Sequence, residues 1–261
     1  MSFIDTHTHL YAGEFDPDRD DAIGRAVQKD VTKLLLPAID RSYYEVMMHL
    51  ADRFPDTCHT MIGLHPTSVR KGYLDELDFV QAKLEEDQTR YCGIGEIGID
   101  LYWDKTYQAE QEDAFIRQLD LAIRYHLPVA IHTRNSFDLA LEIIKKKKNP
   151  ELKGVFHCFS GSVKQAEDAI DAGFMLGIGG VVTYKNSGLQ KVVEIMDLEH
   201  LILETDAPWL PPVPYRGQRN ESAYIPVIAE KIAELKKTTI REVEESTTQN
   251  AITLFKIVTT Q

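Results

Sequence analysis

The sequence lacks most features that mark disulfide-rich, secreted or membrane-spanning chains. It has only three cysteines in 261 residues and no Cys-x-x-Cys pair, so we expect no disulfide framework. No apolar run approaches the roughly 18 residues that span a bilayer. The first residues also lack the basic stretch and apolar core of a signal peptide. We therefore expect a soluble protein of the reducing cytoplasm that makes no membrane contact.

Positive charge is scarce as well. The chain has 29 Lys and Arg residues against 41 Asp and Glu residues, which gives a formal net charge of −12. An acidic surface disfavours broad, nonspecific coating of nucleic acid. It does not exclude a nucleic-acid end that enters a pocket holding metal cations. Nothing in the chain indicates an obligate protein partner.

Linkers and low-complexity tracts are missing, so we assign residues 1–261 to one domain. Eight short apolar segments recur along it, each short enough for a strand buried on both faces. Between them lie segments with helical spacing, among them Ala114–Tyr125 and Tyr224–Leu235. This alternation, in a chain near the roughly 250 residues of one barrel, predicts an α/β fold: a single (β/α)8 TIM barrel. The predicted strands are Phe3–Asp5, Val31–Pro37, Cys58–Leu64, Tyr91–Ile97, Pro128–His132, Gly154–His157, Phe174–Ile178 and Leu201–Glu204.

Histidines and carboxylates gather at the C-terminal ends of these segments. In a (β/α)8 barrel those ends meet at one face, where active sites lie. Five of the nine histidines occupy such positions. Because burying so many ionisable groups without partners is costly, a bound cation is the simplest explanation. The residues concerned are His7, His9, Glu96, His65, His132, His157, Glu204 and Asp206.

The same residues predict two divalent metal ions. His7 and His9 are two positions apart in an extended segment, so both side chains can reach one ion. Glu96 lies in an apolar, glycine-rich run, where it would stay ionised between two cations. Mixed imidazole and carboxylate ligands suit Zn, Mn, Co, Ni or Fe, and Mg, which prefers oxygen ligands, stays a candidate. The hypothesis assigns His7, His9, Glu96 and Asp206 to one ion and Glu96, His132 and His157 to the other.

A metal-activated water would then be the nucleophile, since a bound metal lowers the pKa of water from 15.7 to about 7. Asp206 would orient or deprotonate that water, and Glu96 would bridge the ions. His65 would meet a substrate phosphate or act as a general acid. Arg134 has the fork geometry to hold a phosphate or carboxylate. The alternative for Arg134 is a salt bridge with Glu96, Glu204 or Asp206.

Two further segments could bind a substrate, but each also has an ordinary structural explanation. The run Lys145–Lys148 is expected to end a helix, where cations complement the helix dipole. Tyr102 and Trp103 follow the fourth predicted strand. They either stack on a base or sugar at the mouth of the barrel or simply cover its rim.

Taken together, these segments resemble the TatD family of metal-dependent deoxyribonucleases, within the wider amidohydrolase-like group of barrels. The resemblance spans nearly the whole chain in family order. The matching segments are Asp5-Thr-His7-Thr-His9-Leu10, Gly63-Leu-His65-Pro66, Gly95-Glu96-Ile-Gly98-Ile-Asp100, Leu127-Pro-Val-Ala-Ile-His132-Thr-Arg134, His157-Cys-Phe-Ser-Gly161, Glu204-Thr-Asp206-Ala-Pro208, Pro212–Glu221 and Thr248-Gln-Asn250-Ala.

The resemblance implies a divalent-metal-dependent phosphodiesterase that acts on DNA, often as an exonuclease, with single strands or ends as substrate. It implies the same six metal ligands, and it places His65, Arg134 and Glu204 in or near the pocket as substrate or supporting residues. One position departs from the family. An acidic residue often follows the His-x-His-Leu motif, whereas this chain has Tyr11.

Two other functions stay open. A metal-dependent amide, ester or lactone hydrolase would use the same scaffold, because folds do not fix function. A phosphate clamp would separate the two, with Arg134 and His65 both pointing into the pocket. A metal-binding protein without catalysis would have closed, saturated metal sites, whereas a catalytic site keeps one position open.

Overall fold

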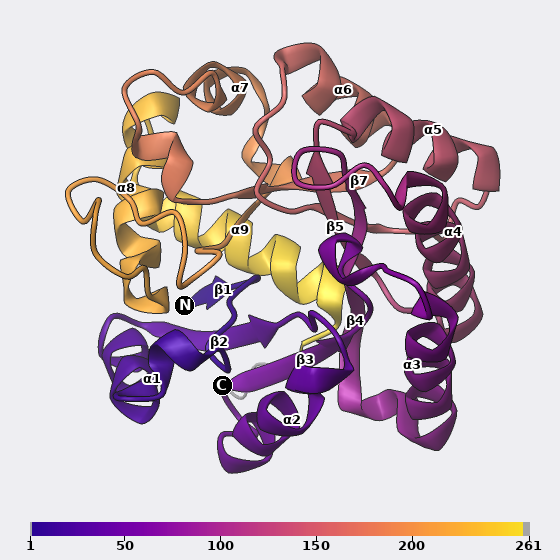
Figure 1. The fold of residues 1–261 in the computed structure, drawn as a ribbon. Helices are drawn as coiled ribbons and strands as arrows, with labels where there is room; N and C mark the ends of the chain where they lie inside the picture. Colours follow the sequence, from indigo (N-terminus) through magenta and orange to yellow (C-terminus); the bar gives the residue numbers. More distant parts are fainter. Residues whose placement is uncertain (1, 258–261) are drawn as a thin grey trace.

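The eight strands form one parallel sheet in chain order in the computed structural model, which describes residues 2–257 (Figure 1). Backbone hydrogen bonds join the first and last strands beyond their ends: Thr6 N donates to Leu203 O at 3.0 Å, and Asp206 N donates to His7 O at 2.9 Å. The sheet therefore closes, and the predicted (β/α)8 fold is confirmed. The strands are β1 Phe3–Asp5, β2 Val31–Leu36, β3 Cys58–Ile62, β4 Tyr91–Asp100, β5 Val129–Arg134, β6 Gly154–Phe156, β7 Phe174–Ile178 and β8 Leu201–Leu203.

The strand ends differ from the predicted ones in a consistent way. β2, β3, β6 and β8 end one or two residues earlier than predicted, before the polar or proline-containing loops. β4 and β5 instead run further. Their pairing continues through Gly98 with His132 and Asp100 with Arg134, so polar strand ends stay inside the sheet. The fourth and fifth strands thus hold three candidate side chains, with His132 and Arg134 in regular pairing and Glu96 at a register shift between Ile94 and Ile97.

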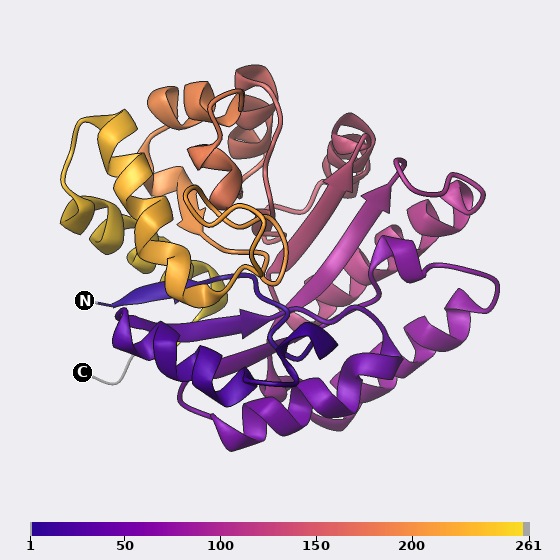
Figure 2. The same ribbon diagram turned by 60° about the vertical axis from the view of Figure 1, so that its left-hand side comes forward.

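Helices surround the barrel (Figures 1 and 2). The stripe predicted in Ala114–Tyr125 is the inner face of α4, where Phe115, Leu119 and Ala122 are buried, although α4 begins six residues earlier. The run of lysines ends α5, as predicted. Within residues 2–257, no helix is long and apolar enough to cross a membrane. The helices are α1 Arg19–Gln28, α2 Tyr44–Arg53, α3 Tyr73–Asp87, α4 Gln108–Tyr125, α5 Phe137–Lys147, α6 Val163–Asp171, α7 Leu189–Ile195, α8 Ile225–Lys236 and α9 Ile240–Phe255.

The last helix packs against the inner core of the barrel, and Figure 1 shows it crossing the middle of the ring of helices. Ala251 and Phe255 of α9, with Ile257 after it, form one buried cluster with side chains from six strands. That cluster is separate from the core between strands and outer helices. The strand members are Ile4, Leu35, Met61, Ala130, Val155 and Ile202. The candidate metal-binding residues lie beyond this buried cluster, at the C-terminal ends of the strands.

Candidate metal centre

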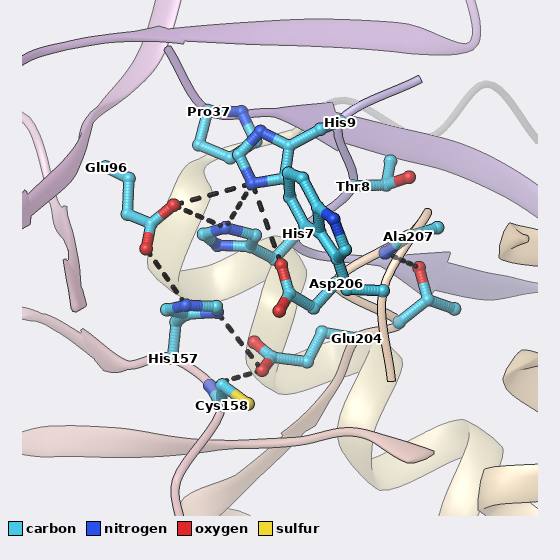
Figure 3. A network of polar contacts seen from close by, with 12 residues as sticks. His7, Thr8, His9, Pro37, Glu96, His157, Cys158, Glu204, Asp206 and Ala207 are labelled. Atoms are coloured by element: carbon cyan, nitrogen blue, oxygen red, sulfur yellow. Dashed lines mark hydrogen bonds and ion pairs between the residues drawn. The ribbon is translucent and has the colours of Figure 1, made fainter. Parts of the chain in front are cut away.

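All five strand-end histidines converge on the carboxylate of Glu96, which is only 2% exposed. His7 Nε2 and His9 Nε2 lie 3.1 and 3.5 Å from Oε2. The other oxygen, Oε1, faces three imidazoles: His65 Nε2 at 3.2 Å, His132 Nδ1 at 2.8 Å and His157 Nε2 at 3.0 Å. Figure 3 shows Glu96 facing His7 and His157 from across the site. The prediction that these side chains meet at one face is therefore confirmed.

The first histidine pair is held by backbone pairing between the ends of β1 and β8. Thr8 bridges Ala207, and His9 N donates to Ala207 O at 2.7 Å. The same pairing places Asp206 beside the pair, with its Oδ1 3.7 Å from His9 Nε2. Asp206 has a φ of 57°, in the left-handed region that its short polar side chain tolerates. The positions of three candidate metal ligands, His7, His9 and Asp206, therefore depend on the pairing between the ends of β1 and β8.

Tyr11 replaces the expected acidic residue and bonds His9 directly. Its hydroxyl lies 2.8 Å from His9 Nδ1 and donates its own hydrogen to Pro37 O. The hydroxyl oxygen must therefore accept the hydrogen of Nδ1, and Nε2 is the nitrogen of His9 that faces Glu96. A hydrogen bond that fixes the tautomer and orientation of a histidine is what metal ligands usually have.

His65 has the opposite tautomer. The backbone N–H of Thr67 donates to His65 Nδ1 at 3.1 Å, so that nitrogen is an acceptor. Its proton is then on Nε2, which faces Glu96 and the cavity. His65 is therefore presented as a hydrogen-bond donor, which suits an oxygen of the substrate better than a cation.

Asp100 belongs to this site as well, although the sequence alone assigned it no role beyond its place in a motif. Its Oδ2 lies 2.9 Å from His132 Nε2. Its Oδ1 accepts hydrogen bonds from the backbone N–H groups of Tyr102 and Trp103 at 2.9 and 3.2 Å. One carboxylate therefore orients a candidate ligand and anchors the loop after β4. The only sequence signal for this role was an aspartate at a strand end.

Glu204 lies behind the site. It is fully buried, its Oε1 is 3.4 Å from His157 Nδ1, and it accepts the backbone N–H of Cys158. It is not among the residues that line the cavity. Of the two roles left open for it, support of His157 matches this position, and direct contact with a substrate does not.

Electrostatics at the site also favours a cation. Burial acts to raise the pKa of Glu96, but the positive charges of His65, His157 and His7 outweigh burial and hold that pKa well below its usual range. Burial raises the pKa of Asp206 to about 6. Burial and the charge of His157 lower the pKa of His7 well below its usual value. Burial acts to lower the pKa of His157 and His132 too, but Glu96 and Glu204 hold the pKa of His157 well above its usual value, and Asp100 and Glu96 raise that of His132. A bound cation would displace the protons on these two imidazoles, because histidine binds metals in its neutral form.

Unsatisfied polar atoms point the same way. The buried nitrogen His7 Nδ1 has no hydrogen-bond partner within residues 2–257, and His157 Nδ1 has only the Glu204 carboxylate 3.4 Å away. Unpaired buried atoms of this kind are rare in folded proteins. Donor atoms lie within 4.8 Å of one another in three groups, so the residues fit a bound cation, although His132 is grouped with His65 rather than with His157. The groups are His7, His9 and Glu96; His7, His157 and Asp206; and His65, Glu96 and His132.

A cavity of about 660 Å³ opens onto this cluster. Arg134 and His65 both line it. Arg134 forms no ion pair with any described residue; its guanidinium carbon instead lies 3.8 Å from the Tyr102 ring centre and 5.0 Å from that of Trp103. A larger hollow of about 880 Å³ lies at the opposite end of the barrel, but none of the cluster residues lines it. We place the chemistry at the smaller cavity because the ionisable residues gather there.

Comparisons with known proteins agree with this geometry. The family described as "TatD related DNase" matches residues 4–256. An uncharacterized metal-dependent hydrolase, YabD of Bacillus subtilis, is 36% identical over 97% of this chain and 99% of its own. Human deoxyribonuclease TATDN3 is 31% identical over 98% of this chain and 95% of its own. The crystal structure of YjjV, a TatD homologue from Escherichia coli, superposes with a TM-score of 0.93 at 33% identity and covers 98% of each chain.

Proposed function

We propose that this chain, which belongs to the TatD-related DNase family of metal-dependent hydrolases, is a deoxyribonuclease that hydrolyses phosphodiester bonds at single-stranded DNA or DNA ends. The observation that supports it most strongly is the contact of one buried carboxylate, Glu96, with five imidazoles beside Asp206. The acidic net charge of −12 favours an end that enters the cavity over binding along a duplex.

The proposal assigns the metal ligands as the sequence did. His7, His9, Glu96 and Asp206 would hold one divalent ion, and Glu96, His132 and His157 would hold a second. Zn, Mn, Ni, Fe and Mg are the candidates. The ions would supply a nucleophile at neutral pH and neutralise charge on the transferring phosphate. Asp206 would orient the attacking water, because its carboxylate lines the cavity next to His9.

His65 and Arg134 would act on the phosphate. His65 presents Nε2–H to the cavity, so it can donate to a phosphate oxygen or to the leaving group. Arg134 has no carboxylate partner among the described residues to neutralise it, and its stack on Tyr102 holds the guanidinium in place. A free, oriented guanidinium matches two phosphate oxygens, whereas an amide or lactone offers no such pair. This is the observation that favours the phosphodiester over the alternative substrates.

Hydrolysis of small chromogenic substrates distinguishes a phosphodiesterase from a carboxylic-ester hydrolase. The metal-loaded protein should hydrolyse bis(p-nitrophenyl) phosphate and leave p-nitrophenyl acetate near its background rate. Arg134→Ala should lower kcat/KM for the phosphodiester by about 10- to 100-fold, since loss of a charged hydrogen bond is worth about 1.5–3 kcal/mol. Arg117→Ala, which removes an exposed arginine paired with Asp113 on α4, is the matched control and should leave it unchanged. Hydrolysis of the acetate alone, indifferent to Arg134, would favour the carboxylic-ester hydrolase.

The remaining assignments follow the same proposal. We propose one domain over residues 1–261, in line with a barrel whose strands run from Phe3 to Leu203. We also propose the reducing cytoplasm as the compartment, because Cys58, Cys92 and Cys158 are all free.

A further inference from the structure

Both tryptophans of the chain lie at the mouth of the same cavity. The sequence contains only two, Trp103 and Trp209, and both line the cavity over the metal centre. They are 69% and 44% exposed. Tryptophan is highly buried on average, so two exposed indoles at one opening need a reason. Exposed apolar surface around a pocket indicates a binding site.

The two rings come from opposite sides of the barrel. Trp103 follows β4, and Trp209 follows β8. The Trp209 ring centre lies 5.1 Å from that of His9, so this indole reaches the metal centre itself. The Trp103 ring lies 5.0 Å from the Arg134 guanidinium carbon, which places it beside the proposed phosphate contact. The two indoles therefore flank the place where a scissile phosphate would sit.

The backbone of each tryptophan is hydrogen-bonded to an aspartate of the site. Trp103 N donates to Asp100 Oδ1 at 3.2 Å. Trp209 N donates to Asp206 O at 2.9 Å, and Trp209 O accepts from the side chain of Asn220, which is fully buried, at 2.6 Å. These contacts fix the backbone that presents the rings. Tryptophan on a fixed backbone has only two side-chain torsion angles to order, so it binds with little loss of conformational entropy.

We propose that Trp103 and Trp209 stack on unpaired bases on either side of the scissile phosphate, and so restrict the enzyme to single-stranded ends. This inference rests on the proposed deoxyribonuclease function. Stacking on an aromatic ring tolerates any sequence, because every base has a π-face. Bases within a duplex are already stacked on their neighbours and must be unpaired before they can reach the indoles. An acidic chain that binds through stacking should also show a weak dependence of affinity on salt.

The affinity of tryptophan variants for a single-stranded oligonucleotide tests whether Trp103 and Trp209 bind bases. Asp206→Asn should suppress cleavage, so that binding of a ten-nucleotide single strand to the full-length, metal-supplied protein can be followed by tryptophan fluorescence and by anisotropy of a labelled strand. In that background, Trp103→Ala and Trp209→Ala should each weaken binding by about 10- to 100-fold, the equivalent of one stacked base. The Phe variants should retain most of the affinity. Ile195→Ala, which removes a 46% exposed apolar side chain on α7, is the control and should bind normally.

An abasic strand tests stacking itself. A strand lacking the bases at its two terminal positions should bind the unsubstituted protein as weakly as the normal strand binds the Trp103→Ala, Trp209→Ala double variant. The double variant should bind the abasic strand no more weakly still. Affinities within twofold across the Trp variants, or equal losses on normal and abasic strands, would overturn the stacking pair. Failure of the unsubstituted protein to hydrolyse bis(p-nitrophenyl) phosphate with any metal would instead overturn the proposed function.

Discussion

Replacing Glu96 by Gln should lower the rate of phosphodiester hydrolysis by about 10³-fold or more and weaken metal binding. Both carboxylate oxygens face imidazoles, two on one oxygen and three on the other. The amide would replace one of these acceptors with an N–H donor and remove the negative charge that a pair of cations shares. A loss of about 4 kcal/mol in transition-state stabilisation corresponds to that factor. Steady-state kinetics and metal content after gel filtration would measure both effects.

The matched control is Glu221→Gln, which alters another largely buried glutamate away from the cavity. Glu221 is bonded to Arg25 through both oxygens, at 3.0 Å and 3.1 Å from Arg25 Nε. This variant should lose stability but keep its metal and its kcat. If Glu96→Gln keeps full metal content and activity within tenfold, Glu96 does not bridge metal ions and the ligand assignment fails.

Gly98→Ala should disrupt the barrel where β4 pairs with β5. Gly98 has a φ of 144°, and a Cβ there would lie 2.0 Å from the backbone oxygen of His132, its partner in the sheet. Backbone cannot yield as a side chain can, so the strands must separate. We expect destabilisation of about 3 kcal/mol or more, from left-handed strain and overpacking together. Activity should also fall, since His132 and Asp100 lie on the displaced segment.

Gly24→Ala provides the comparison, because Gly24 lies inside α1 and a Cβ added there would meet no neighbouring atom within 4 Å. It should stabilise the protein by about 0.5–1 kcal/mol through helix propensity alone. Urea unfolding of both variants would measure the difference. A Gly98→Ala protein as stable as the parent would show that the close approach of β4 to His132 is not required.

The sequence was sufficient for the barrel because strands buried on both faces give nearly continuous apolar runs. Phe3–Asp5 and Phe174–Ile178 have the predicted bounds. The predicted ends were one or two residues too late in four strands, and they were too early in the two strands where polar residues stay within the sheet. β4 continues to Asp100 and β5 to Arg134, because inter-strand pairing rather than hydrophobicity decides where those strands end. The start of α4 at Gln108 was missed for a similar reason, since its first turn has few apolar side chains.

For the site, strand-end chemistry identified the converging histidines but not the contacts between them. No pattern showed that Tyr11 would bond His9, or that Asp100 would hold both His132 and the loop after β4. The Asp100–His132 bond joins two strands, and the Tyr11 hydroxyl is also bonded to Pro37 after β2, so these contacts need the folded barrel. Glu204 illustrates the same limit, because its position behind His157 depends on side-chain direction rather than on sequence order. The role of Trp209 needed the folded β8 loop.

The most direct test of the proposed metal-dependent deoxyribonuclease is hydrolysis of end-labelled single-stranded DNA by metal-stripped protein re-supplied with Mg, Mn or Zn, with metal content measured in the same samples. We predict no cleavage without metal, restoration as about two ions bind per chain, and products that shorten from one end. His132→Ala, Asp206→Ala protein should give no products under the same conditions. Protein that binds metal yet leaves DNA intact with every ion, or DNA cleavage that persists in the chelated protein and the double variant, would contradict this function.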